Sequence, residues 1–445
     1  MKDTIVAIAT ASGVASISIV RVSGKDALKI AKKVAPKATP TPREAILTPF
    51  FDKNGSMIDQ GILIYFQAPK SFTGEDIIEF QCHGGVVIAQ EIMESCISAG
   101  ARVANPGEFS KRAFFNGKID LTKAEAIAKM IEAKSLDAVK VLAKQLKGDL
   151  KEFVEKAKDE LLEAIAYSEV MIDYAEEDIP TDIIDKLKIK LNSLKSSLEN
   201  ILDSSLRRKG LIEGFKLSII GKPNVGKSSL LNSILNYERA IVSQIAGTTR
   251  DTIEESIRVG SHIIKIVDTA GIRDAKDEIE KIGVEKSKQS IKEADIIVAL
   301  FDSSREFDKE DKEILNILKA NQDKEILVLL SKSDLESKID SSKLLEFNPI
   351  KIDKNSIKPL LKALEKILDK FSVDEELLLS STRQIEIVKE TIESINLAFE
   401  PLEREELEFF SFHLQDAVSK LSLLTNPYES EQILDKMFSE FCLGK

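Results

Sequence analysis

The chain has 445 residues, of which 43% are hydrophobic and 31% are charged, and it carries a formal net charge of −11. That length exceeds one ordinary hydrophobic core and predicts about three domains, while the acidic balance argues against a surface that binds nucleic acid indiscriminately. The three cysteines, Cys82, Cys96 and Cys442, lack disulfide or metal-ligand spacing, and no apolar stretch reaches about 18 residues, so we expect a reducing cytoplasm and no membrane.

Residues 1–118 mix short segments that alternate at strand period, such as 17–22, with turns that contain Gly or Pro. This pattern predicts an N-terminal α+β domain. A basic cluster, Arg102, Lys111, Arg112 and Lys118, lies near its end. The cluster is either a local RNA contact or ordinary solvated surface charge.

From residue 119 to residue 210, Ala, Glu, Lys and Leu dominate, and apolar residues recur three or four positions apart, as between Leu150 and Ile165. The same helical spacing returns in residues 373–445, for example between Ile385 and Phe399. We therefore predict an all-α helical domain built from both segments, with residues 211–372 inserted as one unit. A second basic cluster, at 207–209, leaves the same two interpretations open.

The inserted segment alternates strand and helix patterns. Its residues 221–228, Gly-Lys-Pro-Asn-Val-Gly-Lys-Ser, fit GxxxxGK[ST] and follow an apolar run at 215–220. Such a loop turns backbone N–H groups toward β- and γ-phosphate oxygens, while Lys227 adds a positive charge and Ser228 a hydroxyl for Mg²⁺. A hairpin turning at 260–261 and apolar runs at 296–301 and 326–330 complete the pattern of a Ras-like α/β P-loop GTPase domain.

Two further segments of this domain carry nucleotide chemistry. Residues 247–251 offer hydroxyls for a metal switch, and residues 268–271, Asp-Thr-Ala-Gly, place an aspartate and a glycine N–H where Mg²⁺ and the γ-phosphate are sensed. Ile272 replaces the glutamine that positions water in Ras-like enzymes, so another group must orient the attacking water. Glu280 is one candidate, although a glutamate in this acidic segment also suits an ordinary helix start.

The choice of base is predicted further along. Ser331-Lys332-Ser333-Asp334 resembles the [NT]KxD element of GTPases, in which the aspartate accepts two hydrogen bonds from guanine and the lysine stem covers the ring. Ser331 replaces the usual asparagine, and the expected Ser-Ala-Lys element at 352–355 is degenerate. The sequence predicts guanine specificity with two departures from the usual pattern.

Further motifs extend a family resemblance over the whole chain. Phe72-Thr73-Gly74-Glu75-Asp76, His83-Gly84-Gly85 and the segment 105–110 precede the phosphate loop in order, and Phe441-Cys442-Leu443-Gly444-Lys445 ends the chain. Together they resemble the tRNA-modifying GTPase family MnmE, also called TrmE. The resemblance implies a homodimer whose N-terminal domains bind 5-formyltetrahydrofolate or a related tetrahydrofolate. With an FAD-containing partner, MnmG, such a protein adds an aminomethyl or carboxymethylaminomethyl group to carbon 5 of the wobble uridine of certain tRNAs.

The resemblance also implies site residues by position. The folate contacts are Arg21, Glu79, Lys118 and Lys445, and Cys442 matches a family cysteine that is either a buried structural thiol or a nucleophile. The GTPase depends on potassium, with K⁺ ligands at Asn224, Ser243, Ile245 and Thr248, Mg²⁺ ligands at Ser228 and Thr249, and Glu280 as the general base. The GTP contacts are Asn224, Val225, Gly226, Lys227, Ser228, Ser229, Ser243, Gln244, Ile245, Ala246, Gly247, Thr248, Thr249, Asp268, Thr269, Ala270, Gly271, Lys332 and Asp334.

Two other functions stay open at this point. A regulatory GTPase switch in ribosome assembly would bind RNA without modifying it, and the phosphate loop and switch segments alone do not separate it from a modification enzyme. The N-terminal domain and residues 442–445 favour modification. A folate-binding scaffold with a vestigial GTPase is disfavoured, because Lys227, Ser228, Thr249, Asp268 and Glu280 are all present.

Overall fold

The computed structural model describes residues 3–173, 183–238, 255–267, 290–353, 357–371, 376–426, 431–439, 441 and 444. By packing, the chain divides into two compact units. Unit 1 comprises Met1–Ile131, Gln145–Leu194 and Glu386–Lys445, and unit 2 comprises Glu132–Lys144 and Lys195–Ile385. The domain boundaries expected after residues 118, 210 and 372 stay predictions, because packing units and domains need not coincide.

Unit 1 contains a six-stranded mixed sheet in the order β3-β4-β5-β2-β1-β6. The strands are β1 (Ile5–Ile8), β2 (Ile17–Ser23), β3 (Ala45–Phe51), β4 (Met57–Phe66), β5 (Ile77–His83) and β6 (Arg102–Val103). The β1–β6 pair is parallel, and the other pairs are antiparallel. Because side chains alternate along a strand, Arg21 and Glu79 lie on the opposite face from their neighbours Val20 and Ile78.

The two faces of this sheet are covered differently. Helices α1 (Ala27–Val34) and α2 (Val86–Ser98) pack on the face of Val20 and Ile78 in a continuous apolar core. Helix α3 (Glu108–Phe115) serves the other face, where Phe109 packs with Ile5 and Ala7 of β1. The face that carries Arg21 and Glu79 is therefore the one that α3 covers.

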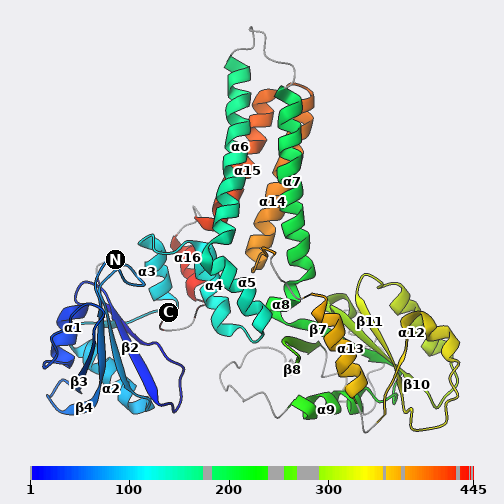
Figure 1. Ribbon diagram of the computed structural model, residues 1–445, viewed down its shortest axis with the longest axis horizontal. Helices are drawn as coiled ribbons and strands as arrows, with labels where there is room; N and C mark the ends of the chain where they lie inside the picture. The colour runs from blue at the N-terminus through cyan, green and yellow to red at the C-terminus, as the bar shows by residue number, and fades with distance from the viewer. Residues whose placement is uncertain are drawn as a thin grey trace. The chain divides into compact units, whose positions relative to one another are not determined.

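The helical part of the chain consists of amphipathic helices of 9 to 25 residues. These are α4 (Leu121–Glu132), α5 (Leu136–Lys147), α6 (Asp149–Asp173), α7 (Ile183–Arg207), α14 (Thr382–Glu403), α15 (Leu407–Thr425) and α16 (Glu431–Ser439). Helices α6 and α15 pack along each other in unit 1, with the unit 1 parts of α7 and α14, residues 183–194 and 386–403, beside them (Figure 1). The predicted stripe from Leu150 to Ile165 is buried, as expected. Within the described ranges, no helix is long and apolar enough to cross a bilayer.

Unit 2 is built on a second six-stranded sheet, in the order β12-β11-β10-β7-β9-β8. Its strands are β7 (Phe215–Gly221), β8 (Glu255–Val259), β9 (His262–Val267), β10 (Ile296–Asp302), β11 (Glu325–Ser331) and β12 (Ile350–Lys351). All pairs are parallel except the β8–β9 hairpin, which confirms the turn predicted at 260–261. The predicted central strand at 296–301 is buried along its whole length.

Helices cover both faces of this sheet. Helices α9 (Lys227–Glu238) and α13 (Lys358–Asp369) pack on one face, and α12 (Lys309–Lys319) packs on the other. A short helix, α8 (Lys209–Glu213), precedes β7, and a 3₁₀ helix, η1 (Ser341–Phe347), precedes β12. The carboxyl ends of the parallel strands β7, β10 and β11 lie side by side, which is where open α/β sheets bind their ligands.

Candidate functional site

The predicted phosphate loop leaves the sheet at the end of β7. Gly221 has φ +154°, and a Cβ there would lie 2.8 Å from the Leu300 carbonyl oxygen and 2.9 Å from Val225 Cγ1. Only glycine fits so close to the neighbouring strand. Asn224 and Gly226 also have positive φ, at 61° and 108°, so the chain curls back before α9 begins at Lys227. The predicted strand, loop and helix are therefore all present.

The Lys227 ammonium lies inside the curve of this loop. It donates hydrogen bonds to the carbonyl oxygens of Gly221 at 2.5 Å and Lys222 at 2.8 Å. Burial lowers the pKa of the Lys227 amine from its usual value. Ser228 and Ser229 follow in the first turn of α9 and are exposed. The N-terminal N–H groups of the helix and the lysine thus converge where an anion is favoured.

A second lysine anchors the loop from its outer side. The Lys222 ammonium is 2.8 Å from Asp308 Oδ2 and 2.7 Å from Asp311 Oδ2. These aspartates form the capping box of α12. Sequence reasoning assigned Lys222 no role, since its partners lie 86 and 89 residues further along the chain.

Ser331 joins the base-reading element to the phosphate loop. Its hydroxyl donates to the Val225 carbonyl oxygen at 2.8 Å and lies 3.2 Å from the Phe301 carbonyl oxygen. An asparagine at this position of the [NT]KxD element usually contacts both the loop and the base. The serine keeps a bond to the loop, but its single hydroxyl is shorter than the asparagine carboxamide, which offers both a carbonyl oxygen and an NH₂ group.

The other residues of this element lie at the same edge of the sheet. Lys332 has φ 56°, and its ammonium is 2.6 Å from Asp302 Oδ2 at the end of β10. Burial opposes ionisation of Asp302, but hydrogen bonds from Lys332 and Ser304 outweigh it, so the pKa of Asp302 lies below its usual value. Asp334 is exposed two residues further on.

Several predicted site residues lie outside the described residues. In the nucleotide site these are Ser243, Gln244, Ile245, Ala246, Gly247, Thr248, Thr249, Asp268, Thr269, Ala270, Gly271 and Glu280. Cys442 and Lys445 of the terminal motif also lie outside them.

Two of the predicted folate residues lie side by side on adjacent strands of the unit 1 sheet. Arg21 of β2 and Glu79 of β5 are register partners, and a guanidinium nitrogen lies 2.7 Å from Glu79 Oε1. The Arg21 guanidinium carbon also lies 5.9 Å from the centre of the Phe109 ring of α3. Both side chains are only partly exposed, at 19% and 12%. Their separation of 58 residues hides the pair from inspection of the sequence.

Lys118, the third predicted folate residue, packs on the loop between β4 and β5. Gly74 in that loop has φ +78°, and a Cβ there would lie 3.2 Å from both Cγ and Cδ of Lys118. The Asn116 amide donates to the Thr73 carbonyl oxygen at 2.7 Å, and the Thr73 hydroxyl lies 2.8 Å from that of Ser23 on β2. Since Ser23 shares a face with Arg21, these contacts tie the Lys118 segment to the Arg21 side of the sheet.

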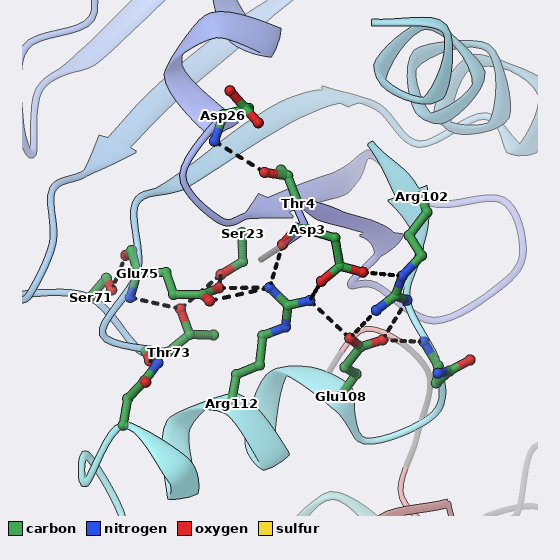
Figure 2. Close-up of polar contacts among 12 residues, drawn as sticks. Asp3, Thr4, Ser23, Asp26, Ser71, Thr73, Glu75, Arg102, Glu108 and Arg112 are labelled. Atoms are coloured by element: carbon green, nitrogen blue, oxygen red, sulfur yellow. Dashed lines mark hydrogen bonds and ion pairs between the residues drawn. The ribbon is translucent and has the colours of Figure 1, made fainter. Parts of the chain in front are cut away.

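A buried ion network centred on Arg112 holds α3 in place (Figure 2). Arg112 is 1% exposed, and its guanidinium nitrogens lie 2.9 Å from Asp3 Oδ1, 3.0 Å from Glu108 Oε1 and 3.1 Å from Glu75 Oε2. Arg102 adds a contact of 2.6 Å to the same Glu108 oxygen. Glu75 lies in the loop between β4 and β5 on which Lys118 packs, and Asp3 precedes β1. The network therefore joins that loop, helix α3 and the sheet.

The interpretation of the first basic cluster needs correction. An RNA contact or solvated surface charge is wrong for Arg112, because its charge is buried and neutralised by three carboxylates. Lys111 is likewise buried and paired with Asp435. In the second cluster, Arg208 is partly exposed and pairs with the exposed Glu376, which agrees with surface charge.

The described part of the terminal motif docks on unit 1. A Cβ on Gly107, which precedes α3, would lie 2.1 Å from the Phe438 carbonyl oxygen and 3.0 Å from Phe441 Cβ. A Cβ on Gly444 would lie 2.5 Å from the Ile8 carbonyl oxygen. Ile8 follows Ala7, the register partner of Arg21. Gly444 thus lies at the end of β1, the strand beside the one that carries Arg21, although more than 400 residues separate the two in sequence.

Comparison with known proteins covers the chain from end to end. The family model described as "GTP-binding protein TrmE N-terminus" matches residues 4–118, and "MnmE helical domain" matches residues 121–442. The chain is 60% identical to "tRNA modification GTPase MnmE" of Sulfurovum sp. (strain NBC37-1) over 446 residues, 100% of this chain and 99% of the relative. It is 58% identical to the protein of that name from Aliarcobacter butzleri (strain RM4018) over 444 residues, again 100% and 99%.

Among solved structures, a crystal structure of Aquifex aeolicus Era matches 41% of this chain and 67% of that chain, at 25% identity and a TM-score of 0.26. That likeness is too small to carry an argument. The two family models and the full-length relatives agree with the predicted fold class, an α+β N-terminal domain and a helical domain with an inserted P-loop GTPase domain. On these matches, the chain belongs to the MnmE (TrmE) family of tRNA modification GTPases.

Proposed function

We propose that this GTPase works with an FAD-containing partner, MnmG, to add an aminomethyl or carboxymethylaminomethyl group to carbon 5 of the wobble uridine of certain tRNAs. It acts as a homodimer in the cytoplasm, hydrolyses GTP in a potassium-dependent manner and takes its one-carbon unit from a tetrahydrofolate. One observation carries the proposal: the same chain contains a phosphate loop held by Ser331 and a polar Arg21–Glu79 pair in the sheet whose strand β1 Gly444 contacts.

In the nucleotide site, the loop N–H groups and Lys227 bind the phosphates of GTP. Lys227 exchanges its bonds to the Gly221 and Lys222 carbonyls for bonds to β- and γ-phosphate oxygens. Asp334 accepts hydrogen bonds from the guanine edge, and Ser331 holds the Val225 carbonyl so that base and phosphate sites keep a fixed spacing. Glu280 is assigned as the base that orients water, and GTP and water become GDP and phosphate.

The assigned cation ligands fit hard cations in their chemistry, because all are oxygen donors. Mg²⁺ is assigned to the hydroxyls of Ser228 and Thr249. K⁺ is assigned to Asn224, whose side chain is exposed on the curled loop, and to oxygens of Ser243, Ile245 and Thr248. When bound, these cations offset the charge that develops on the phosphate oxygens.

In unit 1, Arg21, Glu79, Lys118 and Lys445 are assigned to the folate. The Glu79 carboxylate accepts hydrogen bonds from the pterin, and the basic residues bind the carboxylates of the glutamate tail. The Arg112 network supports this site indirectly, by fixing α3 and its Phe109 ring beneath Arg21. Cys442 is kept as a candidate for the modification chemistry.

Nucleoside analysis of the tRNA wobble position tests the proposal. Cells that lack the gene are complemented with the wild-type chain, Lys227→Ala or Arg21→Ala, and tRNA digests are analysed by mass spectrometry. The modified uridine should be absent without the gene, return with the wild-type chain and fail to return with either variant. Purified protein should hydrolyse GTP faster in potassium than in sodium at equal ionic strength.

Persistence of the modified uridine in cells without the gene would contradict the proposed function. If such cells instead accumulated immature ribosomal particles, a regulatory GTPase switch in ribosome assembly would replace it. Equal hydrolysis in potassium and sodium would remove only the potassium dependence.

A further inference from the structure

A polar cavity of about 410 Å³ lies in unit 1, away from the Arg21–Glu79 pair. The segment between α3 and α4, one face of α6 and the end of α15 line it. Four lysines line this space, Lys118, Lys123, Lys151 and Lys158, against two carboxylates, Asp120 and Glu155. In a chain of net charge −11, such a local excess of positive charge favours an anionic ligand.

Three of these ammonium groups have no ion pair among the described residues. Lys158 pairs with Glu155 at 3.3 Å, but Lys118, Lys123 and Lys151 have no carboxylate within 4.0 Å in the described part of the chain. Asp120 is already engaged, since its Oδ1 accepts hydrogen bonds from the Thr122 hydroxyl and the Lys123 backbone N–H at the start of α4. The cavity therefore offers more positive charge than it neutralises.

Lys118 connects this cavity with the proposed folate site. Its stem packs on Gly74, and the adjacent Thr73 contacts Ser23, which lies two residues from Arg21 on β2. A folate whose pterin is held by Glu79 and whose first glutamate reaches Arg21 and Lys118 would point further glutamates toward the other lysines. Folates carry such additional glutamates joined through γ-carboxyl groups, each with one free carboxylate.

We propose that this cavity binds the oligo-γ-glutamate chain of a polyglutamylated tetrahydrofolate. The inference rests on the proposed folate function and names the form of the cofactor that the protein selects. The carboxylates of the glutamates pair with Lys123, Lys151 and Lys158 through charge-assisted hydrogen bonds. The amide links bind to the hydroxyl of Ser422 on α15 and to the side chain of Asn426, which follows α15. A volume of about 410 Å³ suits a short flexible chain, since small-molecule sites span roughly 300 to 1,000 Å³.

An RNA backbone fits the same lysines less well. It spreads its phosphates over a long surface, whereas these four lysines gather around one hollow in a chain of net charge −11. RNA binding is therefore an outcome of the test that would overturn the proposal.

Binding of folates of different length to the full-length chain tests it. The titrants are 5-formyltetrahydrofolate with one glutamate and with four, at fixed salt. We expect the wild-type chain to bind the longer form about tenfold more tightly, with a steeper loss of affinity at high salt because ion pairs are screened. Lys151→Ala and Lys123→Ala should remove most of this difference and leave the one-glutamate affinity unchanged.

Lys156→Ala is the matched control, because Lys156 is exposed on the same helix α6 and does not line the cavity. It should keep the full preference for the longer chain. Equal affinity of the wild-type protein for both forms would overturn the inference and leave the folate proposal intact. Failure to bind either form would overturn both.

Two further outcomes also decide against the cavity. If Lys151→Ala and Lys156→Ala kept the same preference for the longer chain, the glutamates would bind elsewhere. If Lys123→Ala and Lys151→Ala lowered tRNA affinity in a filter-binding assay without changing the folate preference, the lysines would serve RNA.

Discussion

At the residue scale, single side chains secure the nucleotide site through contacts that span the sheet. Ser331 replaces the usual asparagine yet donates a hydrogen bond to the Val225 carbonyl oxygen. The Lys222 ammonium pairs with both aspartates of the α12 capping box. Each contact fixes the phosphate loop through a pair of residues far apart in sequence, 86 residues for Lys222 and Asp308 and 106 residues for Ser331 and Val225. Changing either should therefore alter nucleotide affinity without touching a residue that contacts the phosphates.

Replacement of Ser331 by Ala removes the bond to the loop. The buried Val225 carbonyl then loses its partner, and we expect GTP affinity to fall by about 1 kcal/mol, or about fivefold in Kd. Preference over ATP should remain, because Asp334 is unchanged. Titration with a fluorescent guanine nucleotide, with ATP as competitor, measures the affinity and the preference. Ser218→Ala, a buried serine on β7 whose hydroxyl faces Ser290 and not the loop, should bind GTP normally, and an equal loss in both variants would argue against a specific role for Ser331.

The stability of unit 1 depends on pH through the ionisation of Glu108. Burial opposes its ionisation, but hydrogen bonds from Arg102, the Asn105 N–H and Arg112 outweigh it and lower the pKa of Glu108 below its usual value. A lowered folded-state pKa stabilises the fold above the pKa of an unfolded glutamate, about 4.3, and this gain disappears as the pH falls through the folded-state value.

Replacement of Glu108 by Gln should accordingly lower the free energy of unfolding of unit 1 by about 2 kcal/mol at pH 7. The difference from the wild-type chain should shrink as the pH falls below about 4.3. Urea unfolding followed by circular dichroism at several pH values measures it. Glu94→Gln, at an exposed position on α2, should show no such difference. A deficit that stayed constant with pH would contradict the ionic origin.

At the element scale, the eight-residue helix α3 organises the proposed folate site. Its Phe109 lies beside Arg21, its Arg112 centres the ion network, and Gly107 at its start receives the Phe438 carbonyl of α16. The terminal segment follows α16 directly. Close approach at Gly107 is therefore one contact on which docking of that segment depends.

Replacement of Gly107 by Ala should displace the terminal segment, because the new Cβ would lie 2.1 Å from a backbone oxygen. We expect faster digestion by carboxypeptidase and loss of tRNA modification, with GTP hydrolysis unchanged. Gly55→Ala controls for backbone strain, since Gly55 also has positive φ, +85°, but no atom lies within 4 Å of a Cβ there. Full modification by the Gly107 variant would show that docking at this point is dispensable.

At the scale of the whole molecule, the two proposed sites lie in different packing units. The phosphate loop belongs to unit 2, and Arg21, Glu79 and Gly444 belong to unit 1. Each activity should therefore be lost separately when its own site is changed, and tRNA modification in cells should require both.

A reciprocal pair of variants tests this separation. Glu280→Ala should lower GTP turnover by about two orders of magnitude, the usual effect of losing a positioned base, and leave folate binding unchanged. Arg21→Ala should abolish folate binding and leave turnover unchanged. Turnover in potassium and folate titration are measured on both proteins. Normal turnover of the Glu280 variant would exclude it as the base.

The sequence by itself determined the features that depend on neighbouring residues. The GxxxxGK[ST] spacing predicted the loop between β7 and α9, the turn at 260–261 predicted the hairpin, and three-and-four spacing predicted the buried stripe of α6. These features follow from local rules, because turns and helical periodicity are set within a few residues.

Only the tertiary structure decided which distant residues meet. It paired Arg21 with Glu79, bonded Ser331 to Val225 across 106 residues, brought Gly444 to Ile8 and buried Arg112 among three carboxylates. A charged residue in the sequence looks the same whether it is solvated or buried. Strand register and helix packing choose between those environments, and both depend on the whole core and not on local pattern.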